Sequence, residues 1–339
     1  MSEPIVSGDV DGAGFEDFDE MAGAFRTAGW DAGYRQMSAG VFRGSLLSAS
    51  LGSVQITHGH WGKAIRHTGV QPAATHALAF PLSSERRGER WLGSPFGPTN
   101  VLVQGGRSEF DLTTWPDCEL GIFTINETFL CDRIAALTQR DPEQFVKRQG
   151  LLTLQPETAI HIRRALELCF ENLRASSDSP DGAAAVRPMG EDLTDFVLQV
   201  VADAHFDPLP MPALGQRVRL VREAEEFARA NESSVVRISD LCRHLGVCER
   251  TLRYAFAELT GMSPAAYLRT QRFNRVRQVL AEASPGRMQV KTVAYEHGFW
   301  HLGQFARDYH KLFGERPSTT LRTPQGGRDS AGRPLPPCP

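Results

Sequence analysis

Apolar residues in the C-terminal third of the chain recur with a helical period, and the pattern occurs twice. The first copy has Ile238, Leu241, Cys242, Gly246 and Val247, and the second has Val290, Val293, Ala294, Gly298 and Phe299, each displaced by 52 positions. After one inserted residue the match continues at an offset of 53, where Phe256, Leu259, Gly261 and Pro264 correspond to Tyr309, Leu312, Gly314 and Pro317. Such a repeat predicts two similar structural units.

Each copy is typical of a helix-turn-helix. The apolar spacing predicts a short helix, and the glycine that follows (Gly246 or Gly298) permits the turn between two crossing helices. A second helix is expected to start near Cys248 or Trp300 and to end at a glycine. It would bury Leu252 and Phe256 in the first copy, and Phe305 and Tyr309 in the second.

The outward side chains of the second helix in such a motif enter the major groove of DNA. Arginine can form two parallel hydrogen bonds with guanine, and glutamine can do so with adenine. The alternative is a plain helical bundle with solvated arginines, and the duplication of the motif favours DNA binding over it. The candidate base-reading residues are Arg250, Thr251, Arg253 and Tyr254 in the first copy, and His301, Gly303, Gln304 and Arg307 in the second.

The segment between the copies predicts one continuous helix that starts at Ser263-Pro264 and runs to Ala283, because serine caps helices and proline favours the first turn. Such a helix is about 30 Å long, close to the roughly 34 Å between successive major-groove faces of B-DNA. Its arginines could contact phosphates or form a solvated face, and both interpretations stay open. They are Arg269, Arg272, Arg275 and Arg277.

Residues 217–323 resemble the DNA-binding domain of the AraC/XylS family of transcription regulators. The matching motifs are Ile238–Val247, Ser263–Leu268, Val293–Phe299, Phe305–Tyr309, Phe313-Gly314 and Pro317. The resemblance implies an all-α domain of two helix-turn-helix motifs joined by a long helix, with double-stranded DNA and RNA polymerase as partners and activation favoured over repression. The sequence departs from the family at Cys248, at Trp300-His301 and after Pro317, which bears on the DNA sequence preference rather than on the fold.

The charge distribution agrees with this resemblance. The whole chain has a formal net charge of −3. Residues 217–322 contain 18 Arg and Lys against 11 Asp and Glu, which leaves +7 on this region and −10 on the remainder. A basic domain beside an acidic one is typical of a regulator that binds phosphates at one end.

The N-terminal half has a different period. Short runs of alternating apolar and polar residues, separated by Gly, Pro, Asn and Ser, predict an antiparallel sandwich or barrel; they are 52–57, 77–82, 100–103, 109–112 and 120–125. A helical period follows over 156–174. The Ser/Asp/Pro/Gly/Ala-rich stretch 175–190 predicts a flexible connector, and a second helix is expected over 193–204.

This half resembles the sensor domain of regulators of ethanolamine-utilisation operons, through Tyr34–Gly40, Phe42, Gly44, Gly105–Leu112 and Thr114. The resemblance implies an α+β protein whose cupin-like antiparallel β barrel (16–150) holds a small effector, and whose helical segment and linker (151–216) pair two protomers into a homodimer. It leaves the effector unidentified. Candidate pocket residues are the aromatics Phe80, Trp61, Trp91 and Trp115, although aromatics at strand positions are also common in a plain core.

One pair of histidines could also indicate a metal-dependent enzyme. His58-Gly-His60 is similar to the start of a cupin metal site, and a cupin-type metalloenzyme with a helical appendage is the alternative function. A complete metal site needs a carboxylate a few residues later, where the sequence has Lys63, Ala64 and Ile65. We therefore expect no metal, no cofactor and no enzymatic activity. Stoichiometric iron, manganese or zinc in the purified protein would favour the enzyme.

The remaining features limit the location of the protein. The sequence has no run of 18 apolar residues and begins with an acidic rather than a basic stretch, so neither a membrane span nor a secretory signal is expected. Residues 1–15 are expected to be an acidic flexible arm, and residues 324–339 a disordered tail. The six cysteines have no zinc-ligand spacing and are typical of a reducing compartment. We therefore expect a cytoplasmic protein that associates with the nucleoid when bound to DNA.

Overall fold

The computed structural model describes residues 10–83, 90–91, 94–138, 142–146, 149–176, 182–204, 211–231, 236–283 and 288–322. The chain divides into two compact units. Unit 1 comprises Met1–Tyr34 and Arg43–Met211, and unit 2 comprises Arg35–Phe42 and Pro212–Pro339. The short segment Arg35–Phe42 therefore belongs to the unit formed by the C-terminal third, although the residues on either side of it belong to unit 1.

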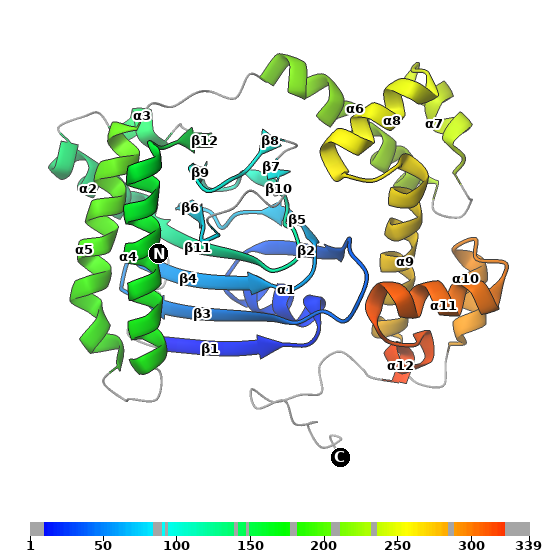
Figure 1. Ribbon diagram of the computed structural model, residues 1–339, viewed down its shortest axis with the longest axis horizontal. Helices are drawn as coiled ribbons and strands as arrows, with labels where there is room; N and C mark the ends of the chain where they lie inside the picture. Colours follow the sequence, from blue (N-terminus) through cyan, green and yellow to red (C-terminus); the bar gives the residue numbers. More distant parts are fainter. Residues whose placement is uncertain are drawn as a thin grey trace. The chain divides into compact units, whose positions relative to one another are not determined.

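Unit 1 contains two sheets, shown in blue to green in Figure 1. The larger has the order β1 (Val10–Phe15), β3 (Gly44–Ser50), β4 (Val54–Trp61), β11 (Cys118–Asn126), β6 (Thr75–Pro81), β9 (Asn100–Gln104) and β12 (Gly150–Thr153). The smaller has the order β2 (Asp31–Gln36), β5 (Ile65–Val70), β10 (Glu109–Thr113), β7 (Arg90–Trp91) and β8 (Ser94–Pro95). The strands expected from alternation thus correspond to β4, β6, β9, β10 and β11.

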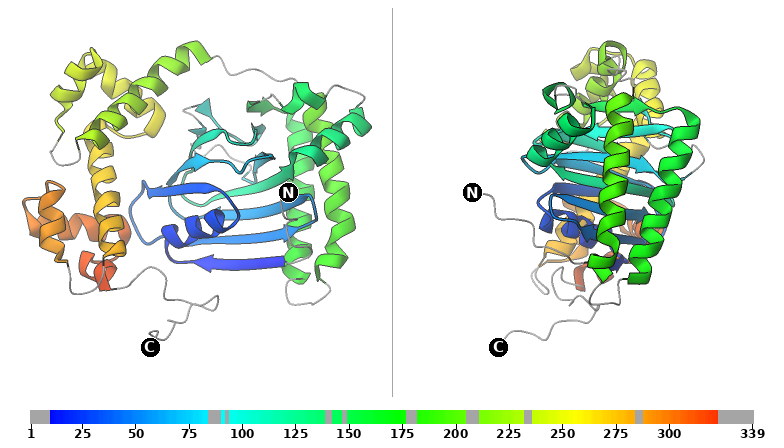
Figure 2. Two further views of the ribbon diagram at one scale, coloured as in Figure 1. Left: turned by 180° about the vertical axis from the view of Figure 1, so that it is seen from behind. Right: turned by 90° about the vertical axis from the view of Figure 1, so that its left-hand side faces the viewer.

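The helices of unit 1 are α1 (Phe18–Thr27), α2 (Glu127–Thr138), α3 (Pro142–Val146), α4 (Pro156–Ser176) and α5 (Gly182–Asp203). Helices α4 and α5 lie side by side against the larger sheet (Figures 1 and 2). Their apolar residues, including Leu166, Phe170 and Val197, form one core with alternate strand residues such as Ile56 and Phe123. Burial of this face against helices is the main apolar contact of the unit.

The expectation of a barrel is corrected by this arrangement, because the described strands form two open sheets that do not close on each other. The α4–α5 pair covers one face of the larger sheet, which provides burial without closure. The opposite face carries alternate residues such as Ser48, Thr57 and Thr124, which line a cavity beside α1. The period of two along the strands therefore separates an apolar face from a more polar one.

Two further expectations for this half also differ from the structure. Residues 10–15, expected within the flexible arm, form β1 and pair antiparallel with β3 from Val10↔Ala49 to Phe15↔Gly44. Residues 182–190, expected within the flexible connector, form the first part of α5, with Pro188 inside the helix. Three successive alanines at 183–185 have high helix propensity, which favours a helix here over a flexible connector.

Unit 2 is helical. Its elements are α6 (Met211–Ala230), α7 (Ile238–Leu245), α8 (Glu249–Thr260), α9 (Pro264–Glu282), α10 (Val290–Glu296), α11 (Leu302–Phe313) and α12 (Pro317–Arg322). Helix α9 starts directly after its N-cap residue Ser263, whose side-chain oxygen accepts a hydrogen bond from the Ala266 amide. The mixed strand-then-helix architecture agrees with the α+β expectation.

The expected disordered tail 324–339 lies outside the described residues. Among the helices of the described ranges, none combines the length and apolar character that crossing a bilayer requires.

Candidate nucleic-acid interface

The first helix-turn-helix is built as the repeat predicts. Helix α7 ends at Gly246, whose φ of 64° lies in the left-handed region that glycine adopts without strain. Helix α8 begins after Cys248 and ends at Gly261, with a φ of 68°. Leu252 and Phe256 are fully buried. The opposite face of α8 is therefore directed to solvent.

The second helix-turn-helix repeats this geometry. Helices α10 and α11 are joined through Gly298, whose φ is 76°, and α11 ends at Gly314, whose φ is also 76°. Phe305 and Tyr309 are buried at the positions expected. His301 is the residue that precedes the first turn of α11. The two copies of the sequence pattern thus form two copies of one structural motif.

The eight candidate base-reading residues share one property, which is exposure to solvent in this structure. They are Arg250, Thr251, Arg253, Tyr254, His301, Gly303, Gln304 and Arg307. All lie on α8, on α11 or at the first residue before α11. This placement excludes the possibility that the two second helices are buried in the core of unit 2.

On α8 the arginines are held by neighbours one turn away. The Arg253 guanidinium donates to Glu249 Oε1 at 2.6 Å. Arg250 donates to the Tyr254 hydroxyl at 3.3 Å, and its guanidinium carbon lies 5.4 Å from the centre of the Tyr254 ring. The Thr251 hydroxyl lies 3.2 Å from Cys248 Sγ. Such i, i+4 pairs preorganise long side chains at small energetic gain.

On α11 the polar side chains form a chain of contacts. Arg307 donates to Gln304 Oε1 at 2.8 Å, and Gln304 donates to Asp308 Oδ2 at 2.7 Å. Arg269 of α9 also pairs with Asp308. Partial burial raises the pKa of the Asp308 carboxyl, but hydrogen bonds from Gln304 and Arg269 outweigh that effect and leave it below its ordinary value.

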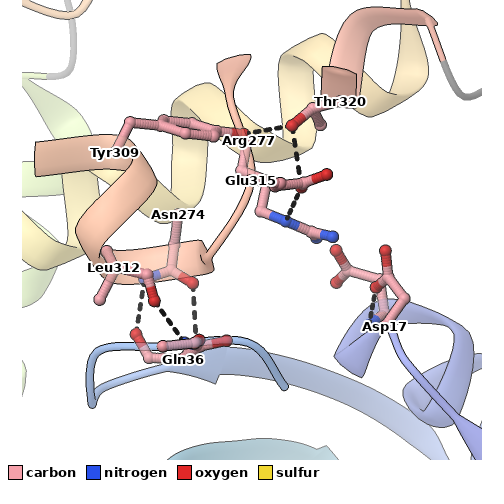
Figure 3. A network of polar contacts seen from close by, with 10 residues as sticks. Asp17, Gln36, Asn274, Arg277, Tyr309, Leu312, Glu315 and Thr320 are labelled. Carbon is pink, nitrogen blue, oxygen red and sulfur yellow. Dashed lines mark hydrogen bonds and ion pairs between the residues drawn. The ribbon is translucent and has the colours of Figure 1, made fainter. Parts of the chain in front are cut away.

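The arginines of α9 have different environments. Arg269 pairs with Asp308, and the Arg272 guanidinium carbon lies 5.1 Å from the centre of the Phe299 ring. Arg275 is exposed. Arg277 is buried and donates from Nε to Glu315 Oε1 at 3.3 Å (Figure 3). For Arg277 neither of the two expected roles fits, because the side chain lies inside unit 2.

The ion pair between the buried Arg277 and the half-buried Glu315 belongs to a network that links the end of α11 to α12. Glu315 Oε1 also accepts from the Thr320 hydroxyl at 2.9 Å. The Tyr309 hydroxyl lies 2.8 Å from Thr320 Oγ1, and the Arg277 guanidinium carbon lies 5.6 Å from the centre of the Phe313 ring (Figure 3). A buried charge paired and hydrogen-bonded in this way is costly to disrupt.

Unit 1 contains a cavity of about 290 Å³ between α1 and the polar face of the larger sheet. Its described lining carries hydroxyl and amide groups together with aromatic and aliphatic carbon, and no charged side chain. The lining residues are Ala13, Phe15, Ala24, Phe25, Thr27, Ala28, Trp30, Leu46, Ser48, Ser50, Gln55, Thr57, Ile122 and Thr124.

The four aromatics expected to form an effector pocket are not among these lining residues. Phe80 belongs to the core beneath α4 and α5. Trp61 and Trp91 are buried, and Trp115 is 46% exposed. Trp61 stacks on the lining residue Phe25, with ring centroids 6.4 Å apart, and so contacts one residue of the cavity wall. Lining residues such as Ser48 and Thr57 were missed because small polar residues on a strand give no distinctive signal.

Comparison with known proteins gives a consistent result. A family model described as a helix-turn-helix domain matches residues 241–323. The "XylDLEGF operon transcriptional activator" of Pseudomonas putida is 34% identical over 67% of this chain and 68% of its own. The chain belongs to the AraC/XylS family of transcription regulators.

Two further matches differ in extent. The "Probable thc operon regulatory protein" of Rhodococcus erythropolis is 32% identical over 45% of this AraC/XylS chain, which spans about half (47%) of that relative. A solved structure of the AraC-like transcriptional activator CuxR aligns over 81% of this chain and 96% of its own, with 17% identity and a TM-score of 0.41.

The histidines that favoured an enzyme are in ordinary polar contacts in this AraC/XylS protein. His58 Nε2 lies 2.9 Å from Glu119 Oε2, and Arg174 donates to His58 Nδ1 at 2.9 Å. The hydrogen bond from His58 lowers the pKa of Glu119. His60 Nε2 lies 3.7 Å from Asp117. Within the described ranges no three or more His, Cys, Asp or Glu side chains are grouped to hold a metal ion.

Two exposed aromatics next to α11 were not among the candidate residues. Trp300 is 67% exposed and Tyr295 is 41% exposed, and their rings stack with centroids 5.8 Å apart and an interplanar angle of 26°. Trp300 directly precedes His301, at the end of α11 that a helix-turn-helix inserts into the groove. The signal was present in the sequence, because tryptophan stands there in place of the small polar residue usual for the family.

Proposed function

We propose that this regulator binds specific DNA sequences by placing α8 and α11 in two successive major grooves. Arg250 and Arg253 on α8, and Gln304 and Arg307 on α11, would contact base edges. The observation that carries the proposal is the exposure of all eight candidate residues on, or directly before, two matched second helices. Helix α9 has 19 residues, about 28 Å of helix, which suits the spacing of adjacent grooves.

The remaining arginines of unit 2 would neutralise phosphates, and transcription activation through contact with RNA polymerase is the outcome that we favour. The net charge of +7 over residues 217–322 supports a phosphate-anchored complex. The experiment that tests this function selects binding sites for the full chain from random DNA and measures affinity for the selected site at several salt concentrations. Affinity should fall steeply as salt rises, and a salt-independent affinity would contradict the proposal.

We also propose that unit 1 is a sensor domain whose cavity beside α1 binds the effector. The uncharged lining and the aromatic rings of Phe15, Phe25 and Trp30 favour a small, uncharged molecule with an aromatic part and a hydroxyl or carbonyl group. The resemblance to ethanolamine-operon regulators does not determine this ligand and stays a prediction.

A thermal-shift panel tests the sensor. The panel contains phenols and aromatic amides, each matched with an aromatic carboxylate of the same size. Their effect on the melting temperature is measured for the parent chain and for Ile122→Trp, whose larger side chain fills the cavity. The uncharged members should raise the melting temperature of the parent only. Equal shifts in both proteins would place the binding elsewhere.

We infer that two copies pair through the α4–α5 face. Ile160 and Leu168 of α4 and Phe196 of α5 are exposed large apolar residues, at 52%, 49% and 41%. Ile160 and Leu168 are eight residues apart and so share one side of the helix. A second copy of the chain would cover this surface, as in helix-mediated dimers.

A further inference from the structure

The segment Gln36–Val41, which we name the capping loop, closes the C-terminal end of the second recognition helix. The last carbonyl groups of any α-helix lack partners within the helix. The Gly40 amide donates to the carbonyl oxygens of Lys311 and Leu312, at 3.0 Å each. The Gln36 side-chain amide donates to the Leu312 carbonyl as well (Figure 3). Partners for the end of α11 thus come from a segment more than 270 positions earlier in the chain.

The same loop is fixed to the middle of α9 by a reciprocal pair of hydrogen bonds. The Gln36 amide donates to Asn274 Oδ1 at 2.9 Å, and Asn274 Nδ2 donates to the Gln36 carbonyl at 3.0 Å. Gln36 is 0% exposed and Asn274 is 8% exposed. Buried amides are costly when they lack partners, so each residue holds the other in place.

The two ends of the loop make apolar contacts with both helix-turn-helix motifs. Met37 packs against the core of the first motif, which includes Leu241 and Phe256. Val41 lies so close to Gly314 that a Cβ on this glycine would be 2.3 Å from Val41 Cγ2. The loop therefore contacts the first motif, the connecting helix and the end of α11 within unit 2.

We propose that Gln36 and Asn274 are positioning residues for DNA reading: the capping loop sets the direction of α11 relative to α9, and thereby the direction of Gln304 and Arg307. This inference rests on the proposed function, in which α11 reads DNA. The chain on both sides of the loop belongs to unit 1, so the loop is joined covalently to unit 1 and by hydrogen bonds to a recognition helix.

Two variants of the full chain test the inference through different atoms. Gln36→Ala removes the side-chain contact with Leu312 but keeps the backbone contacts with Asn274. Asn274→Ala removes the anchor on α9 but keeps the side chain of Gln36. Gln278→Ala is the matched control, because it removes an exposed amide from the same helix α9.

Two measurements compare these variants with the parent. Hydroxyl-radical footprinting on the selected site reports which DNA is protected, and amide hydrogen exchange of the free protein reports the stability of each helix. Both variants should lose about tenfold in affinity, the magnitude of one or two lost buried hydrogen bonds. Protection of DNA should be lost in the half contacted by α11 and kept in the half contacted by α8. Exchange should accelerate in the last turn of α11 but not in α8, and the control should match the parent in both measurements.

Equal loss in both halves, or faster exchange throughout unit 2, would overturn the inference, because it would show a general structural role. Parent-like footprints and exchange in both variants would overturn it too. Arg307→Ala measured in parallel separates this result from failure of the proposed function. If Arg307→Ala leaves the footprint unchanged, α11 does not read DNA and the proposed function fails; if it removes the α11 half while Gln36→Ala and Asn274→Ala do not, only the positioning inference fails.

Discussion

Arg307 donates a hydrogen bond to the side-chain oxygen of Gln304, one turn earlier on α11, at 2.8 Å. Gln304 in turn donates to Asp308, so in the free protein the groups proposed to read bases already bind each other. In the proposed complex, these contacts are exchanged for contacts with base edges. The exchange limits the net gain in affinity but keeps the side chains in a defined arrangement before binding.

The Gln304–Arg307 contact predicts that substitutions at these positions are not additive. Gln304→Ala and Arg307→Ala should each cost about 1–3 kcal/mol for the selected site and relax specificity in the half read by α11. The double variant should cost less than the sum, because each single change already disturbs the other side chain. Arg187→Ala on α5, which removes an exposed arginine from unit 1, serves as the control. Strict additivity of the two losses would show that the residues act independently in the complex.

Glu249 should weaken non-specific DNA binding, because its carboxylate pairs with the Arg253 guanidinium. Glu249→Ala removes an acidic side chain and releases the Arg253 guanidinium from its 2.6 Å contact. We therefore expect tighter binding to random DNA and a smaller ratio between specific and random DNA, whereas Arg253→Ala weakens specific binding by about 1–3 kcal/mol. Competition titrations at fixed salt measure both quantities. Unchanged random-DNA affinity in Glu249→Ala would contradict this role.

The helix-turn-helix pair could be predicted because its signals are local. Glycines at fixed positions, the Ser263 cap and apolar residues three and four apart each determine a short stretch of backbone, and their repetition left little freedom. Exposure of the candidate residues followed from the same period, since residues two apart, such as Arg250 and Leu252, lie on opposite sides of one helix.

Other features depend on contacts between distant segments and could not be predicted in this way. The capping loop joins Gln36 to Asn274, 238 positions apart, and nothing near Gln36 in the sequence indicates it. Closure of a sheet is also a tertiary property: the alternation along β4 and β11 predicted strands, but not whether helices or other strands would cover them. The cavity beside α1 follows the polar face of the larger sheet and not the four aromatics expected from the sequence.

Trp300 should contact DNA through apolar surface rather than charge. Its exposed ring, stacked on Tyr295, lies beside the N-terminal end of α11, where thymine methyl groups and deoxyribose are accessible to a groove-binding helix. Trp300→Ala should weaken specific binding several-fold without changing the dependence of log affinity on log salt, because no phosphate contact is lost. Trp115→Ala in unit 1, which also removes an exposed tryptophan, is the matched control and should bind like the parent. A reduced salt slope in Trp300→Ala would indicate a phosphate contact instead.

The α4–α5 face predicts how the chain associates. Ile160→Glu with Leu168→Glu places two charges on the exposed apolar surface, which should shift a dimer to monomers, with little effect on folding since both positions face solvent. Sedimentation velocity over a range of concentrations measures the change. His161→Glu on the same helix is the control for added charge at an exposed position. A parent chain that sediments as a monomer at all concentrations would rule out this interface.

His67 should make unit 1 sensitive to acid. The ring is buried against Tyr34 and Trp61, with centroids 4.4 and 5.0 Å away, and burial lowers the pKa of His67 to about 3. An unfolded chain binds a proton at this residue below pH of about 6.5, whereas the folded chain does not until about pH 3. The contribution of His67 to the free energy of unfolding is therefore fully present above pH 6.5 and is lost as pH falls, by up to about 1.4 kcal/mol per pH unit.

The variant His67→Phe tests this prediction, because phenylalanine fits the same aromatic surroundings and the Thr114 hydroxyl keeps its hydrogen bond to the Ile65 carbonyl. Urea unfolding of this variant between pH 7 and pH 4 should show a shallower decline than the parent, while the exposed His161→Phe should follow the parent; identical declines for parent and His67→Phe would show that His67 does not titrate on unfolding in this range.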